Sequence, residues 1–81
     1  MELKYIMCDN NSFAIFSLTE THSDMCRGMY GKPVSAGFCN FARKADTEYA
    51  NVHCYGESVT LRLKSREEDE QIINKKLENN Y

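Results

Sequence analysis

The sequence predicts a small α+β domain, in which one mostly antiparallel sheet carries a short central helix and a C-terminal helix, in the order ββαβββα. Two observations favour this class. Short segments rich in strand-forming residues alternate with clusters of turn residues, and the chain then ends in a charged segment with helical periodicity. A length of 81 residues is enough for one domain and too short for two, so we expect residues 1–81 to form a single domain.

The first seventeen residues are typical of a β-hairpin. Residues 3–8 are rich in strand formers, residues 9–12 are a run of Asp, Asn and Ser, and residues 13–17 are again mostly apolar. A short helix of about ten residues is expected next. Thr21 can cap its start, and Gly31 and Pro33 end it, because Gly suits the position after a helix and Pro cannot continue one.

Residues 34–42 and 51–56 are predicted to form a second hairpin, joined by the polar residues 43–50. A turn centred between residues 46 and 47 pairs Cys39 with Cys54 and Phe41 with Val52, which gives one apolar face by strand alternation. The opposite face of the same two strands then carries Phe38, Asn40, His53 and Tyr55.

Residues 57–64 alternate between apolar and polar side chains, so a half-buried strand is expected with Val59, Leu61 and Leu63 facing the core. A helix over residues 66–78 follows. Ser65 and Glu68 form a capping-box pattern at its start, and its narrow apolar stripe predicts that it packs at a sheet edge.

Charge and hydropathy restrict the setting of the protein. Ten basic and twelve acidic residues give a net charge of −2, which argues against general nucleic-acid binding. No signal peptide and no apolar stretch long enough for a membrane span are seen, so a cytoplasmic location without membrane contact is expected. A core this small is only marginally stable by itself, so a homo-oligomer is a reasonable expectation.

Four cysteines are scattered along the chain, at positions 8, 26, 39 and 54. In a cytosol they stay reduced, and their spacing lacks the close pairs that are typical of zinc sites. We therefore interpret them as buried thiols and expect neither a metal nor another cofactor.

Five residues form the candidate ligand site: Phe38, His53, Tyr55, Arg62 and Arg66. The three aromatic rings share one predicted sheet face, and the two arginines follow on the polar side of the last strand and at the start of the last helix. Aromatic stacking and arginine hydrogen bonds are the usual means of holding a base and a phosphate. The alternative is a polar face that a helix or a second subunit partly covers.

Catalytic residues are not assigned. His22, Ser23 and Asp24 are adjacent on a helix, where neighbouring side chains do not face one another, so helix capping accounts for them. His53 and Cys54 point to opposite faces of a strand and cannot form a pair.

Four segments resemble small uncharacterised proteins of phages and prophages: residues 21–25 (THSDM), 33–39 (PVSAGFC), 52–58 (VHCYGES) and 63–69 (LKSREED). This resemblance brings no catalytic motif. It implies a non-enzymatic accessory protein in the host cytoplasm, which acts against host defence by occupying a host protein or sequestering a nucleotide-like signal. A small enzyme, a metal-binding protein and a nucleic-acid-binding regulator remain the alternatives.

Overall fold

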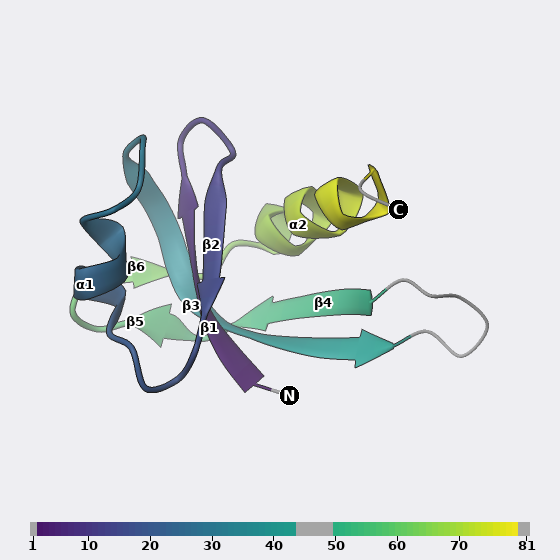
Figure 1. Cartoon of the computed structure of the whole chain (residues 1–81), viewed down its shortest axis with the longest axis horizontal. Helices are drawn as coiled ribbons and strands as arrows, with labels where there is room; N and C mark the ends of the chain where they lie inside the picture. The colour runs from purple at the N-terminus through teal and green to yellow at the C-terminus, as the bar shows by residue number, and fades with distance from the viewer. Residues whose placement is uncertain (1, 44–49, 80–81) are drawn as a thin grey trace.

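The computed structural model describes residues 2–43 and 50–79 and confirms the α+β class. Its main sheet is antiparallel, with strand order β2-β1-β3-β4. A two-stranded hairpin, β5-β6, follows β4. Figure 1 shows helix α1 and the β5-β6 hairpin near one end of the sheet and helix α2 near the other. The elements are β1 (Glu2–Cys8), β2 (Phe13–Phe16), α1 (His22–Cys26), β3 (Pro33–Arg43), β4 (Ala50–Tyr55), β5 (Glu57–Ser58), β6 (Leu63–Lys64) and α2 (Glu67–Asn79).

The two predicted hairpins are present. In the first, the Asn10 side chain accepts hydrogen bonds from the backbone and hydroxyl of Ser12, which closes the turn. In the second, Cys39 lies opposite Cys54 and Phe41 opposite Val52, so the register predicted from the sequence is confirmed. The turn expected between residues 46 and 47 lies outside the described residues.

Each face of the main sheet has its own core cluster. The cluster under α2 is built on Tyr5, Met7, Cys39, Val52 and Ile73, all fully buried. The cluster on the other face is smaller: Ile6, Phe16 and Ala36 pack there against half-buried side chains of α1 and the β5-β6 hairpin. Strand alternation therefore divides the apolar residues of β1 and β3 between two layers.

The first helix is shorter than expected. Thr21 caps it as predicted, because its hydroxyl accepts a hydrogen bond from the Asp24 backbone N–H at 3.2 Å. The helix ends at Cys26 instead of continuing to residue 30. Turn hydrogen bonds from Gly28 N–H to the Met25 carbonyl and from Met29 N–H to the Cys26 carbonyl then lead the chain away.

The predicted strand over residues 57–64 is wrong, because this segment folds back on itself as the β5-β6 hairpin. The Ser58 hydroxyl accepts a hydrogen bond from Leu61 N–H, and Arg62 N–H bonds to the Val59 carbonyl, so a turn replaces the middle of the strand. Val59, expected in the core, is 81% exposed, while Ser58 is buried. Side-chain competition for backbone groups overrides the period-2 pattern here.

The start of α2 also differs from the prediction. Ser65 N–H bonds to the Gly56 carbonyl, which ties Ser65 to the hairpin, and α2 begins two residues later. The Asp69 carboxylate, not the Ser65–Glu68 pair, reaches back to Arg66 N–H at 3.0 Å. A buried carboxylate is the stronger acceptor, so the predicted Ser65 cap is wrong.

Helix α2 covers the outer edge of β4, as its narrow apolar stripe predicts. The Asn74 amide accepts a hydrogen bond from Val52 N–H at 2.8 Å and donates one to the Val52 carbonyl at 3.0 Å. Glu70 accepts a further hydrogen bond from Cys54 N–H. These side chains take the place of a neighbouring strand, which closes this edge to pairing with other chains.

We expect Asn74→Ala to lower the free energy of unfolding by about 1–3 kcal/mol, because both backbone groups of Val52 lose their partner. Chemical denaturation measures the change. Gln71→Ala is the matched control, since Gln71 is an exposed amide on the same helix. Equal effects of the two variants would contradict the edge-closing role of Asn74.

Candidate functional site

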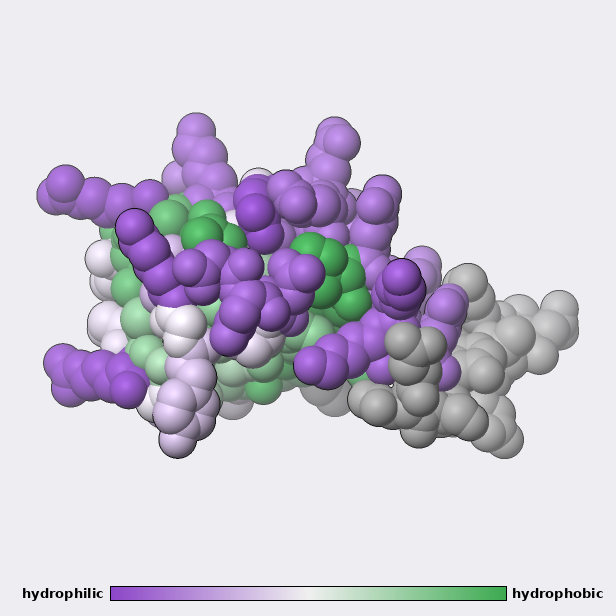
Figure 2. Space-filling view, turned by 90° about the horizontal axis from the view of Figure 1, so that it is seen from above, coloured by the Kyte–Doolittle hydropathy of each residue, from purple (hydrophilic) through white to green (hydrophobic). Residues whose placement is uncertain are grey.

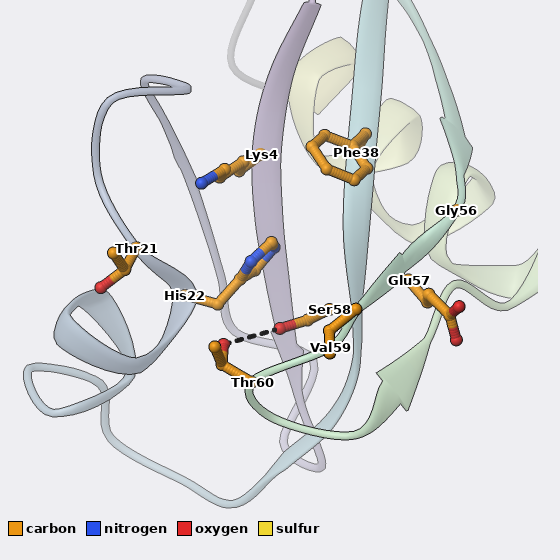
Figure 3. Close-up of a pocket in the computed structure, with 9 residues that line it drawn as sticks. All are labelled: Lys4, Thr21, His22, Phe38, Gly56, Glu57, Ser58, Val59 and Thr60. Carbon is orange, nitrogen blue, oxygen red and sulfur yellow. Dashed lines mark hydrogen bonds between the residues drawn. The ribbon is translucent and has the colours of Figure 1, made fainter.

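A hollow of about 520 Å³ lies on the α1 side of the main sheet. Figure 3 shows that its walls come from β1, the start of α1, β3 and the segment that runs from the end of β4 into the β5-β6 turn. The residues that line it are Lys4, Thr21, His22, Phe38, Gly56, Glu57, Ser58, Val59 and Thr60.

Phe38 joins this cavity to a row of aromatic rings. The Tyr55 ring stacks on Phe38 with centroids 6.1 Å apart and an interplanar angle of 25°. His53 stacks on Tyr55 at 5.9 Å and 21°. The prediction that these three rings share a sheet face is thus confirmed, and their spacing follows from the register that pairs Phe38 with Tyr55.

The two rings of this row that do not line the cavity, those of Tyr55 and His53, each contact a carboxylate. The Glu2 carboxylate accepts a hydrogen bond from the Tyr55 hydroxyl, and this hydrogen bond raises the pKa of Tyr55 to about 12. The Nδ1 atom of His53 lies 3.1 Å from a Glu70 carboxylate oxygen. Tyr55 and His53 are thereby oriented outside the cavity, while Phe38 alone of the three lines it.

His22, which the sequence analysis assigned only to helix capping, forms the inner wall of the cavity. It is 5% exposed, and its ring meets Phe16 and Phe38 edge to face, with centroids 5.4 and 6.1 Å away. Its Nε2 donates a hydrogen bond to the Gly37 carbonyl at 2.9 Å. Burial lowers the pKa of His22, partly opposed by that carbonyl, so the ring is neutral near pH 7.

Lys4 supplies the positive charge of the cavity. Its Nζ donates a hydrogen bond to the Glu20 carbonyl at 2.7 Å, which holds the side chain beside α1. An ammonium group has three donors, so two remain for water or a ligand. No local pattern in the sequence distinguishes Lys4 or His22, because pairing between distant segments brings them together.

Two glycines allow the end of β4 to lie close against β3, and one of them, Gly56, lines the cavity. A Cβ at Gly37 would lie 2.5 Å from the Tyr55 carbonyl oxygen, so only glycine allows this close approach. Gly56 has a φ of +76°, and a Cβ there would lie 3.0 Å from Phe38. The turn at Gly56 directs the following segment across the cavity.

The two arginines of the predicted site do not gather around the aromatic row. Arg62 lies in the exposed β5-β6 turn, with a φ of 57°, and not on a strand as expected. Arg66 lies on the other face of the sheet, where its Nε donates to the Ser35 hydroxyl at 3.1 Å. Ser35 and Phe38 are three residues apart on β3, and alternation therefore sends them to opposite faces.

Arg66 is instead part of a buried polar network. Both Nε and Nη2 of Arg66 donate to Asp69 Oδ1, at 3.0 and 2.9 Å, and the Tyr5 hydroxyl donates to Asp69 Oδ2 at 2.6 Å. Asp69 is fully buried. Burial alone would raise the pKa of its carboxyl group, but the hydrogen bonds from Tyr5, Ser35 and Arg66 outweigh it and hold this pKa below its ordinary value. Arg66 thus stabilises the fold.

The cysteines take no part in the cavity. All four are free thiols, and Cys39 and Cys54 lie in the core under α2. Burial raises the pKa of Cys39 to about 11 and that of Cys54 to about 12, so both stay protonated near neutral pH and are weak nucleophiles.

Among the residues that the structure describes, no cluster of three metal-ligating side chains occurs. Neither α1 nor α2 is long and apolar enough to cross a membrane.

Comparison with protein-family models, with curated proteins and with solved structures finds no match to this chain.

Asp69 makes the stability of the protein depend on pH. Because the folded carboxyl has a pKa below its ordinary value of 3.8, its contribution is complete above that pH and is lost as the pH falls through the folded pKa. We expect the free energy of unfolding to fall in this acidic range and Asp69→Asn to make that fall shallower. Denaturant titrations at several pH values measure both.

Asp24→Asn is the control, since Asp24 is an exposed acid that pairs only loosely with Arg27, at 3.7 Å. If Asp69→Asn is too unstable to analyse, an NMR titration of the Asp69 carboxyl carbon in the unaltered protein gives its pKa directly. A pKa at or above the ordinary value would contradict the role assigned to this network.

Proposed function

We propose that this chain is a non-enzymatic binding protein of the phage accessory kind, which captures a small nucleotide-like ligand in the cavity beside Phe38. The cavity itself is the observation that carries the proposal. Its volume of about 520 Å³ falls within the range of small-molecule sites, roughly 300–1,000 Å³. A concave site of this kind favours a small ligand over the flat surface of a host protein.

The lining of the cavity supports a ligand with an aromatic ring and a negative charge. Phe38 offers a ring that is backed by Tyr55, and the ammonium group of Lys4 offers charge-assisted hydrogen bonds. The hydroxyl groups of Ser58 and Thr60, which lie 3.4 Å apart, can donate to or accept from a sugar or base edge. His53 and Tyr55 extend this recognition only at the outside of the site.

Capture without reaction fits the state of the titratable groups nearby. The Nε2 proton of His22 is committed to the Gly37 carbonyl, and burial keeps the ring neutral. The Tyr55 hydroxyl donates its hydrogen bond to Glu2, and its raised pKa keeps it protonated near neutral pH, so it is a weak acid and has no phenolate to act as a base. Release of the ligand in unchanged form is therefore expected. On the resemblance to phage proteins, we place this capture in the host cytoplasm, directed against a nucleotide signal of host defence.

The test uses a mixed pool of nucleoside monophosphates, nucleoside triphosphates, cyclic mononucleotides and cyclic dinucleotides. The protein is incubated with the pool and separated from it, and the retained compounds are identified by mass spectrometry after denaturation. We expect one class to be retained and returned unchanged. Retention of none would overturn the proposal, and recovery of a product would favour the enzyme alternative. Salt-sensitive retention of DNA would favour the regulator alternative.

For the retained compound, Phe38→Ala should weaken binding by about 5- to 150-fold, because loss of one stacking ring costs roughly 1–3 kcal/mol. Phe38→Leu keeps most of the volume, so a similar loss in that variant would assign the effect to stacking and not to collapse of the wall. Isothermal titration calorimetry measures both dissociation constants. Wild-type affinity in both variants would show that the compound binds elsewhere.

Lys4→Gln removes the positive charge that Lys4 contributes to the lining and should weaken binding of an anionic ligand, and it should also reduce the dependence of the dissociation constant on salt. Lys32→Gln is the matched control, because Lys32 is exposed and does not line the cavity. Equal effects of the two substitutions would mean that net charge, not contact with Lys4, governs affinity.

A further inference from the structure

The two outer strands of the main sheet, β2 and β4, differ in whether the backbone groups along their outer edges have hydrogen-bond partners. At β4, Asn74 and Glu70 occupy the outward N–H groups of Val52 and Cys54 and the outward carbonyl of Val52. At β2, no hydrogen bond reaches the outer side of the strand from any residue within 2–43 and 50–79. One edge of the sheet is therefore closed and the other is open.

The pairing of β1 with β2 identifies which backbone groups are open. Cys8 N–H donates to the Ser12 carbonyl, so the backbone groups of Ser12 face β1, and by alternation Ala14 exchanges hydrogen bonds with Ile6 within the hairpin. The N–H and carbonyl groups of Phe13 and Ile15 consequently point outward. They form the donors and acceptors that an added antiparallel strand would use.

The composition of this edge suits pairing with an identical strand. Residues 10–19 contain no charged side chain, whereas exposed edge strands are usually guarded by lysine, proline or a bulge. Two copies placed antiparallel thus bring together no like charges from residues 10–19. Leu18, just after β2, is 45% exposed, and Tyr30, which is 89% exposed, lines a hollow of about 300 Å³ against β2. Figure 2 shows that hydrophilic side chains cover much of the face it displays, with hydrophobic surface visible between them.

We propose that β2 pairs antiparallel with β2 of a second copy across a two-fold axis, which joins the two main sheets into one. The axis is perpendicular to the sheet, because only then do the side chains on each face of one β2 strand continue on the same face of the joined sheet. Outward-pointing groups must meet each other, so Ile15 lies opposite either Ile15 or Phe13 of the second copy. Tyr30 and Leu18 lie at the border of this interface and lose exposure in it.

A second copy fits this edge better than an unrelated peptide does, because it supplies an open, uncharged strand of the same length wherever the protein is present. The inference is independent of the proposed ligand. The cavity beside Phe38 is bounded by β1, β3 and the segment after β4, and no residue of β2 lines it. Dimerisation therefore leaves the cavity open.

The test is sedimentation of the full chain over a wide range of concentration. We expect a reversible dimer, and we expect Leu18→Lys and Ser17→Lys each to weaken self-association by about tenfold or more, because each places a charge directly after β2, at a border that the second copy covers. Gln71→Lys, which adds the same charge on exposed α2, is the control and should dimerise as the unaltered protein does. Circular dichroism checks that each variant is folded.

Hydrogen exchange then locates the interface. The amides of Phe13 and Ile15 should exchange more slowly as the protein concentration rises, while the Ala14 amide, already bonded within the hairpin, should not change. A monomer at every concentration would overturn the proposal. So would a dimer that neither lysine variant weakens, or one whose concentration-dependent protection lies on strands other than β2.

Discussion

The buried carboxylate of Asp69 is the constraint on which the rest of the structure depends. It accepts hydrogen bonds from Tyr5 on a central strand and from Arg66 just before α2, and so fixes the helix to the sheet at one point. A carboxylate that is removed from water is tolerated only when such partners surround it. From that point the helix extends along β4, where Glu70 and Asn74 meet the strand edge.

Because α2 is attached to one face of the sheet, the two faces differ in how completely they are covered. The face under α2 is filled by Tyr5, Met7 and Cys39 and is closed to solvent. The other face is covered only in part, by a five-residue helix and a two-stranded hairpin, and the gap between these two small elements is the cavity. Under the proposed function, stability and ligand binding are carried by opposite sides of the same strands, so a substitution in the cavity should alter binding with little effect on stability.

Local patterns in the sequence predict the sheet better than they predict the site. The alternation along β3 and β4 was sufficient to place Phe38 and Tyr55 side by side, because a two-residue period and one turn position define a register. The predicted strand over residues 57–64 was wrong, because the Ser58 hydroxyl accepts a hydrogen bond that forms a turn. The hydrophobicity pattern of the sequence does not signal this turn. Arg66 was misassigned for a related reason. Its partner Ser35 lies 31 residues earlier, and only the assembled fold brings the two together.

The link between Tyr5 and Asp69 spans 64 positions of the chain and so has a consequence for biosynthesis. A ribosome releases the chain from its amino-terminal side, at about 5–20 residues per second, so the Tyr5 hydroxyl has no partner until Asp69, 64 positions later, has been translated. Until α2 emerges, the outer edge of β4 is open as well. The nascent polypeptide therefore exposes two strand edges, and the edge at β4 closes only after the ribosome has released α2.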